Sequence, residues 1–360
     1  MKRLLFIVFL ILFLACGTSV NAYVSPNDAL KEIEDSIPDG VKQDIPSDAV
    51  ESADAKAIID VGVKSILDAV NPSIKALASI VGVIIISAML NVLRTSITDN
   101  SYAPLFETAS ALVLTLTVYD IVKDVLNAAF SVIENLSLFM NGMIPVMTGL
   151  YLSSGEIASA AASHSGMLMT LNLLENAIRY LFYPILRISI GAAVASCVSK
   201  SELSAISNFL RGFYTTALTF VMAILTFVLS AQSSLAQGAD SMTVRTVRFV
   251  AGSFVPVVGG ALSEAVRTVF GSFSYIKTTV GWGGIIVILV IILPVIIKLF
   301  IVKIVFSASA CLSKMLGCQS ESGIIEEMNK NMNMIIAALL SMAIMFIFSL
   351  TLVIRSALAQ

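Results

Sequence analysis

The stretch Ile74–Leu93, with the sequence IKALASIVGVIIISAMLNVL, is the clearest structural signal in the chain. Lys75, near one end, is the only charged residue among these 20. An α-helix needs about 20 mainly apolar residues to cross the hydrocarbon core of a bilayer. The stretch therefore predicts a transmembrane helix, and residues 105–122 and several later apolar runs extend the pattern toward the C-terminus.

The whole chain shares this apolar character. Of its 360 residues, 57% are hydrophobic and 13% are charged, and the mean hydropathy is +0.93. Soluble domains carry about 25% charged residues. The composition excludes an ordinary soluble enzyme, a disordered protein and a nucleic-acid-binding protein with a basic face. We expect an all-α, polytopic helical membrane protein in contact with membrane lipid, because helices satisfy their own backbone hydrogen bonds.

Residues 1–22 have the features of a cleaved signal peptide. Lys2 and Arg3 precede the apolar run 4–15, and small residues follow up to Ala22. A charged start, an apolar core of about 7–15 residues and a small-residue exit are typical of secretory signals. Two alternatives stay open, namely lipid attachment at Cys16 and retention of the run as a signal anchor. Cleavage after Ala22 would leave the mature N-terminal segment outside the cytoplasm.

The next segment, residues 23–72, is acidic, with 11 acidic residues against four lysines. After residue 50 its apolar residues recur at about the helical period and leave acids on the opposite face. We expect one or two amphipathic helices outside the membrane. They would serve either as a docking surface for a partner or as a solvated stalk.

Short signals recur in the same order along the remaining chain, which suggests an internal duplication. The matched pairs are Pro145–Gly149 with Pro256–Gly260, Pro184 with Pro294, Ser196–Lys200 with Ala310–Lys314, and Met222–Ile224 with Met342–Ile344. They define two leading helices in 73–124 and two repeat units, 125–235 and 247–355. Three apolar runs per unit would make the units inverted copies, as in many transporters. The expected total is about eight spans, within a range of six to nine.

Proline and clustered glycine mark positions where helices are expected to break. The freed backbone groups need partners that lipid cannot supply. The breaks would either line a conduit or substrate site, as in transporters, or form kinks filled by neighbouring helices. The candidates are Pro145, Gly149, Pro184, Pro256, Gly259, Gly260 and Pro294.

Isolated charges within the apolar runs form a second set of candidates. A charge at mid-membrane costs about 2.5–3.5 kcal/mol on insertion scales, so it usually faces the bundle interior or a cavity. These side chains would line a pore, form structural ion pairs or reach the membrane interface. They are Asp120, Glu134, Glu175, Arg187, Glu264, Arg267, Lys298 and Lys303.

The sequence offers no site of chemistry. It contains no Walker-type lysine loop, no His-Glu-x-x-His zinc motif and no nucleophile elbow. The single histidine, His164, lies in a run of small residues and is expected to serve packing or a loop. We therefore expect no enzyme, no cofactor and no metal site, and any energy input must come from a partner.

The stretch Ser253–Gly271, SFVPVVGGALSEAVRTVFG, followed by KTTVGWGG at Lys277–Gly284, resembles the stage III sporulation protein AE family of endospore-forming bacteria. The order of leader, acidic segment and long hydrophobic body agrees with that family as well. The resemblance implies a protein of the mother-cell membrane that faces the forespore. It also implies partners, namely the other stage III sporulation proteins of the AA to AH set and stage II sporulation protein Q. It supplies no catalytic or binding residues.

Three functions are compatible with these observations. The resemblance favours a membrane subunit of a secretion-like channel complex between mother cell and forespore. A second possibility is a stand-alone secondary transporter, a class of protein in which inverted repeats are common. A third is a membrane scaffold that only recruits other proteins of the complex, which in this family include ring-forming proteins.

Overall fold

The computed structural model describes residues 55–96, 103–199, 203–254 and 259–358. These residues form helices joined by short turns, without a strand among them. The helices are α5 (Ala55–Ser96), α6 (Ala103–Ser153), α7 (Ile157–Asn176), η2 (Ala177–Phe182), α8 (Tyr183–Ser199), α9 (Leu203–Phe254), α10 (Gly259–Met315) and α11 (Gln319–Leu358). The predicted signal peptide, 1–22, and most of the acidic segment lie outside the described residues.

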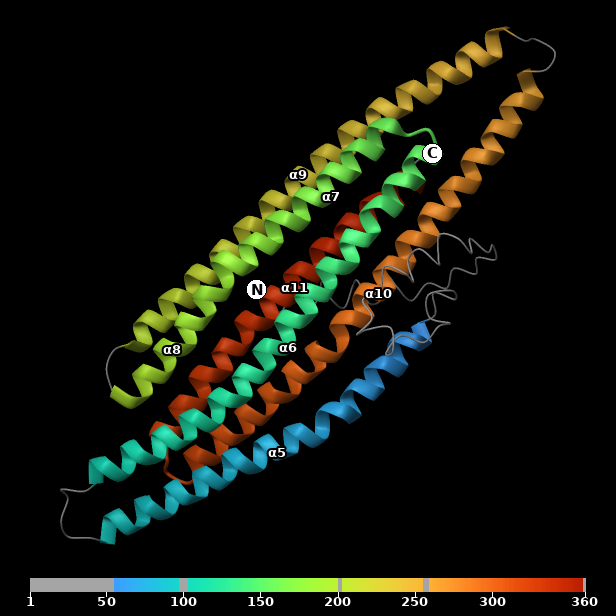
Figure 1. Cartoon of the computed structure of the whole chain (residues 1–360). Coiled ribbons are helices and arrows are strands. Elements are labelled where there is room, and N and C mark those ends of the chain that lie inside the picture. The colour runs from blue at the N-terminus through green and yellow to red at the C-terminus, as the bar shows by residue number, and fades with distance from the viewer. Residues whose placement is uncertain (1–54, 97–102, 200–202, 255–258, 359–360) are drawn as a thin grey trace.

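The helices make six long passes, with α7, η2 and α8 joined into one pass, and successive passes run in opposite directions (Figure 1). The α5–α6, α8–α9 and α10–α11 pairs meet at one end of the bundle. The α6–α7 turn and the end of α11 lie toward the other end, beyond which α9 and α10 project together. The all-α fold predicted from the sequence is confirmed.

The centre of the bundle is formed by α10 and α11. Their most apolar windows are 56% and 61% buried, against 22% in both α5 and α9. Two glycines bring the central helices close together. A Cβ atom on Gly281 would lie 2.5 Å from Cγ1 of Ile354, and one on Gly284 would lie 2.9 Å from Cδ1 of Leu350. Burial on several sides thus explains why the central part of α10 is so apolar.

Glycine has a conformational role in two tight turns. Gly155 and Gly317 have φ of 73° and 78°, the left-handed region that side chains with a Cβ disfavour. Gly155 ends α6, where the backbone N–H of Glu156 donates to the carbonyl of Tyr151 at 3.0 Å. The chain reverses there within three residues, which places Glu156 directly before α7.

Five helices are long and apolar enough to cross a membrane within the described part of the chain. They span Val61–Leu90, Ile157–Ala195, Ala205–Met242, Ser274–Met315 and Gln319–Arg355. Helix α6 is not among them, because polar residues recur along it. The 57 residues of α10 correspond to about 85 Å, well beyond a hydrocarbon core of about 30 Å. Such a helix extends past the membrane on at least one side.

The expected total of about eight spans is not confirmed by the region described. The described residues make six passes, at the lower limit of the expected range of six to nine. The acidic region and the first apolar run merge into α5 through Pro72, and the runs 105–122 and 125–152 merge into α6. The predicted boundary at residue 124 therefore lies inside a continuous helix.

The inverted arrangement of the repeat is not confirmed by the described helices. The sequence 249–273, expected to be one span, is divided between the end of α9 and the start of α10. Only two passes therefore separate the matched sequences at 196–200 and 310–314. The helices that carry them, α8 and α10, run in the same direction, and each ends at the same end of the bundle (Figure 1).

Candidate functional site

A stripe of polar side chains follows the outer side of α6. Between residues 120 and 134 every exposed side chain is polar, and the buried ones between them are apolar. We call the stripe the α6 face; it consists of Asp120, Lys123, Asp124, Asn127, Ser131 and Glu134. None of the six makes a hydrogen bond or ion pair within the described part of the chain. The stripe spans about 21 Å along the helix.

The α6 face is unsuited to contact with lipid. Three carboxylates and one ammonium at mid-membrane would each cost about 2.5–3.5 kcal/mol, so their combined cost would reach about 10 kcal/mol. Such a cost would consume most of the stability of an ordinary domain. The face must therefore meet water or another polypeptide.

A second polar group is buried where α6, α7, α9 and α10 meet. We call Tyr151, Glu156, Asp240 and Lys277 the Lys277 cluster. The Nζ atom of Lys277 lies 2.5 Å from Oε1 of Glu156, and both side chains are at most 2% exposed. The ammonium also lies 4.8 Å from the ring centroid of Tyr151, within cation–π range.

Asp240 completes this cluster at the first turn of α7. Its two carboxylate oxygens accept the backbone N–H groups of Ala158 and Ser159, at 3.0 and 2.6 Å. These N–H groups have no partner inside the helix, and the positive end of the helix dipole favours an anion there. Asp240 thus fixes the start of α7 against α9, and its negative charge also stabilises the ammonium of Lys277.

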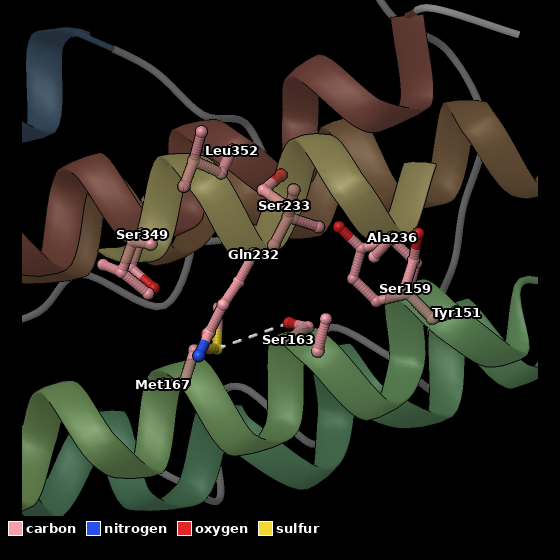
Figure 2. A pocket seen from close by; sticks show the side chains of 12 residues that line it. Tyr151, Ser159, Ser163, Met167, Gln232, Ser233, Ala236, Ser349 and Leu352 are labelled. Atoms are coloured by element: carbon pink, nitrogen blue, oxygen red, sulfur yellow. Dashed lines mark hydrogen bonds between the residues drawn. The ribbon is translucent and has the colours of Figure 1, made fainter. Parts of the chain in front are cut away.

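A small cavity lies beside the Lys277 cluster, between α6, α7, α9 and α11 (Figure 2). Its volume is about 30 Å³, and its lining includes Tyr151, Ser159, Gln232 and Ser349. A water molecule needs at least about 10–15 Å³ of such space. The cavity is therefore large enough for water and too small for a substrate.

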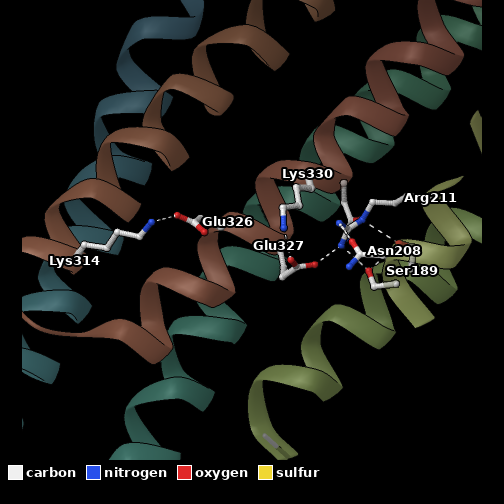
Figure 3. Close-up of polar contacts among 9 residues, drawn as sticks. Ser189, Asn208, Arg211, Lys314, Glu326, Glu327 and Lys330 are labelled. Atoms are coloured by element: carbon white, nitrogen blue, oxygen red, sulfur yellow. Dashed lines mark hydrogen bonds and ion pairs between the residues drawn. The ribbon is translucent and has the colours of Figure 1, made fainter. Parts of the chain in front are cut away.

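A third polar group, the Arg211 cluster, joins α8, α9 and α11 (Figure 3). The guanidinium of Arg211 pairs with Glu327 and donates to Oδ1 of Asn331 at 3.1 Å. Asn331 is fully buried and also accepts a hydrogen bond from Ser189 at 3.0 Å. The remaining members are Ser207, Asn208 and Lys330. Charge-assisted hydrogen bonds of this kind hold helices in one register.

The structure places the predicted charged candidates in different surroundings. Asp120 and Glu134 lie on the α6 face. Arg187 is exposed and stacks on Tyr183 at 4.5 Å from the ring centroid. Glu175 pairs with Arg179 at 3.2 Å, and Lys303 donates a hydrogen bond to Asn333 at 2.6 Å. Lys298 is partly exposed. The side chains of Glu264 and Arg267 lie outside the described residues.

The predicted helix breaks also differ from one another. Pro145 and Gly149 lie inside α6, and Pro294 lies inside α10, both of which continue past them. Pro184 follows the π-helical segment η2, where the N–H of Tyr183 bonds to the carbonyl of Ile178. Pro256 is outside the described residues, and Gly259 and Gly260 begin α10.

Sequence reasoning missed the Lys277 and Arg211 clusters. Glu156 and Lys277 lie between the apolar runs, so they were read as parts of connections. A single lysine directly before a glycine-rich apolar run was the available signal for Lys277. Its partner is 121 positions away, a distance at which composition and periodicity give no information.

These groups suit binding and assembly better than catalysis. In the Lys277 and Arg211 clusters the charged side chains form ion pairs with one another. The charged side chains of the α6 face form no ion pair within the described residues. Within the described residues no three histidine, cysteine, aspartate or glutamate side chains gather as metal ligands. Among the described residues, the α6 face is a polar surface available for contact with solute or partner.

Comparison with known proteins agrees with the resemblance seen in the sequence. The family described as stage III sporulation protein AE matches residues 41–357. Stage III sporulation protein AE of Bacillus subtilis (strain 168) is 26% identical over 283 residues, which cover 78% of this chain and 71% of that protein. No solved structure matches.

Proposed function

Since the chain belongs to the stage III sporulation protein AE family, we propose that it is an integral membrane subunit of a channel or secretion-like complex linking mother cell and forespore. A role in sporulation follows from the family itself. The observation that carries the proposal is the extent of the family match, residues 41–357, which includes nearly the whole helical bundle.

The physical features of the bundle support a subunit that works with partners. Five helices are apolar enough to cross a membrane. The α6 face needs water or protein against it, and the two buried clusters fix the helices that support it. The proposed partners are the other stage III sporulation proteins of the AA to AH set and stage II sporulation protein Q. The proposed location is the mother-cell membrane around the forespore, with the N-terminal segment outside the cytoplasm.

A deletion in the native host tests the proposal. Loss of the gene is expected to arrest forespore development after engulfment begins, and a tagged copy should restore it. The tagged protein should accumulate in the membrane around the forespore and co-purify with other stage III proteins after detergent extraction. Normal heat-resistant spores in the deletion strain, or a tagged protein isolated without such partners, would contradict it.

Reconstitution separates this proposal from a stand-alone transporter. The transporter hypothesis drew its support from an inverted repeat, whereas α8 and α10, which carry one of the matched pairs, run in the same direction (Figure 1). Purified full-length protein in liposomes is expected to show no coupled uptake of solute. Uptake driven by an ion gradient through this chain alone would reject the subunit proposal.

A further inference from the structure

A chain of contacts places parts of four helices at one level of the bundle. The ring of Phe130 in α6 packs edge-on against Tyr183 of α8, with centroids 4.3 Å apart. The adjoining Phe182 packs against Tyr214 of α9 at 5.0 Å. The hydroxyl of Tyr214 donates to the carbonyl of Met334 in α11 at 2.9 Å. Ser131 of α6 is therefore level with this part of α9.

The same level reaches α10. Asn333, which precedes Met334 in α11, accepts a hydrogen bond from Lys303 at 2.6 Å. On either side of Lys303, α10 exposes Phe300 and Ile304, which are 48% and 66% exposed.

The bundle has two kinds of surface at this level. Next to Tyr214, helix α9 exposes Phe213, which is 48% exposed, and α10 exposes the two apolar side chains just named. Helix α6 exposes Asn127 and Ser131, with the charged residues of the α6 face above and below. One side of the bundle is therefore suited to lipid and another to water at the same height. A helix with a solvated face in a bundle that otherwise contacts lipid is typical of the wall of an aqueous passage.

The passage cannot run through the middle of one chain at this level. The inner side of α6 is filled by Val122, Leu126, Ile133 and Leu136, which belong to the continuous apolar core. The α6 face is on the outside and is no wider than one helix, about 10 Å. Enclosing water therefore takes several such faces around an axis, and copies of one chain related by rotational symmetry supply them.

We propose that the α6 face lines a water-filled passage enclosed by several copies of this chain. The proposal rests on the proposed function and adds the wall of the passage and the partner that completes it. The face carries three carboxylates and one lysine, so the faces of neighbouring copies repel direct contact and favour water between them, as acidic rings do in cation-conducting pores. Arg187, stacked on Tyr183 beside Phe130, lies close to the same surface.

Cysteine labelling in native membranes tests the aqueous character of the face. The full-length chain would carry serine at its four native cysteines and one new cysteine, either Ser131→Cys on the α6 face or Phe213→Cys at the same level of α9. A charged, water-soluble methanethiosulfonate is the probe. Because only a thiolate in contact with water reacts, Ser131→Cys is expected to react at least ~10-fold faster than Phe213→Cys. Asn127→Cys provides a second position on the face if Ser131→Cys accumulates poorly.

Cross-linking tests the identity of the wall. Bismaleimides of graded length are expected to join two Ser131→Cys chains into a species of twice the monomer mass, and to leave Phe213→Cys monomeric. Equal labelling at the two positions would overturn the proposal, since the level would then be uniformly wet or uniformly dry. Cross-links to a different protein, without any between copies, would also overturn it and indicate a companion helix against α6. Neither labelling nor cross-linking depends on spore formation. The experiments can therefore reject the water-filled passage while leaving the proposed role in the sporulation complex intact, and the reverse.

Discussion

The substitution Glu156→Gln removes the carboxylate from the buried pair with Lys277 and keeps the size of the side chain. The two atoms lie 2.5 Å apart, and the two side chains are 0% and 2% exposed, so water cannot replace the lost charge. Removing one partner of a buried ion pair costs about 3–5 kcal/mol, because the other charge stays buried without compensation. The charge of Asp240 offsets only part of this loss, because both of its oxygens are already bonded to the first N–H groups of α7 and no bond joins it to Lys277 directly.

The expected result is a lower unfolding temperature of the full-length protein in detergent. For 360 residues at about 2.1 cal/mol/K each, a loss of 3–5 kcal/mol corresponds to a decrease of roughly 4–7 °C. The measurement is the fraction of protein that stays monodisperse after heating, followed by size-exclusion chromatography. The double variant Glu156→Gln with Lys277→Met should recover most of the loss, because it leaves no unpaired charge.

An exposed pair provides the matched control. Glu175 and Arg179 lie 3.2 Å apart with side chains that are 40% and 63% exposed, so Glu175→Gln should cost less than about 1 kcal/mol. The reasoning is refuted if Glu156→Gln shifts the unfolding temperature no more than Glu175→Gln. A double variant less stable than Glu156→Gln alone would refute it as well, since burial of an unpaired ammonium would then not be the cause.

Three further substitutions test the packing and the polar contacts. Asp240→Ala should cost about 1–2 kcal/mol and speed amide exchange in the first turn of α7, and unchanged exchange there would argue against its capping role. Gly281→Ala should lower the unfolding temperature, because the new Cβ would lie 2.5 Å from an isoleucine of α11. Gly191→Ala, with open space around it, should leave the unfolding temperature unchanged or raise it. Equal shifts in the two variants would exclude close packing as the reason for Gly281. Arg211→Met should cost about 1.5–3 kcal/mol by leaving Glu327 without its guanidinium, and Arg211→Lys should recover part of that loss in the same thermal assay.

The helical character of the fold was predictable because it depends on local composition. A chain this apolar must satisfy its backbone in lipid, and long apolar runs do so as helices. The number of passes was less predictable, because the charged pair Lys123–Asp124 separates the apolar runs 105–122 and 125–152 and suggests two spans. In α6 these residues fall on one side of an unbroken helix. A charged residue in an apolar run thus marks either the end of a helix or a polar face along a continuous helix. Distinguishing the two requires the positions of the charges around the helix as well as the length of the apolar run.

Proline gave similarly partial information. A proline in a helix removes one backbone hydrogen bond and crowds the preceding turn. Pro184 is accompanied by the π-helical segment before it, which is a local adjustment of the kind expected. Pro145 and Pro294 lie within continuous helices that pack against several others, so tertiary contacts decide whether such a residue ends a helix. Sequence alone identifies the position and leaves the outcome open.

Two sets of polar residues in the described part of the chain should respond differently to mutation. In the Lys277 and Arg211 clusters each charge has a partner within the chain, so these side chains are bound to the bundle and stabilise the positions of its helices. The six residues of the α6 face have no such partner, and they lower the free energy of the single chain in a membrane only if water or another polypeptide reaches them. Variants of the clusters should therefore reduce thermal stability, whereas variants of the face should leave it unchanged and impair assembly or passage. A face variant such as Glu134→Gln that destabilised the isolated protein would place the α6 face among the structural contacts instead.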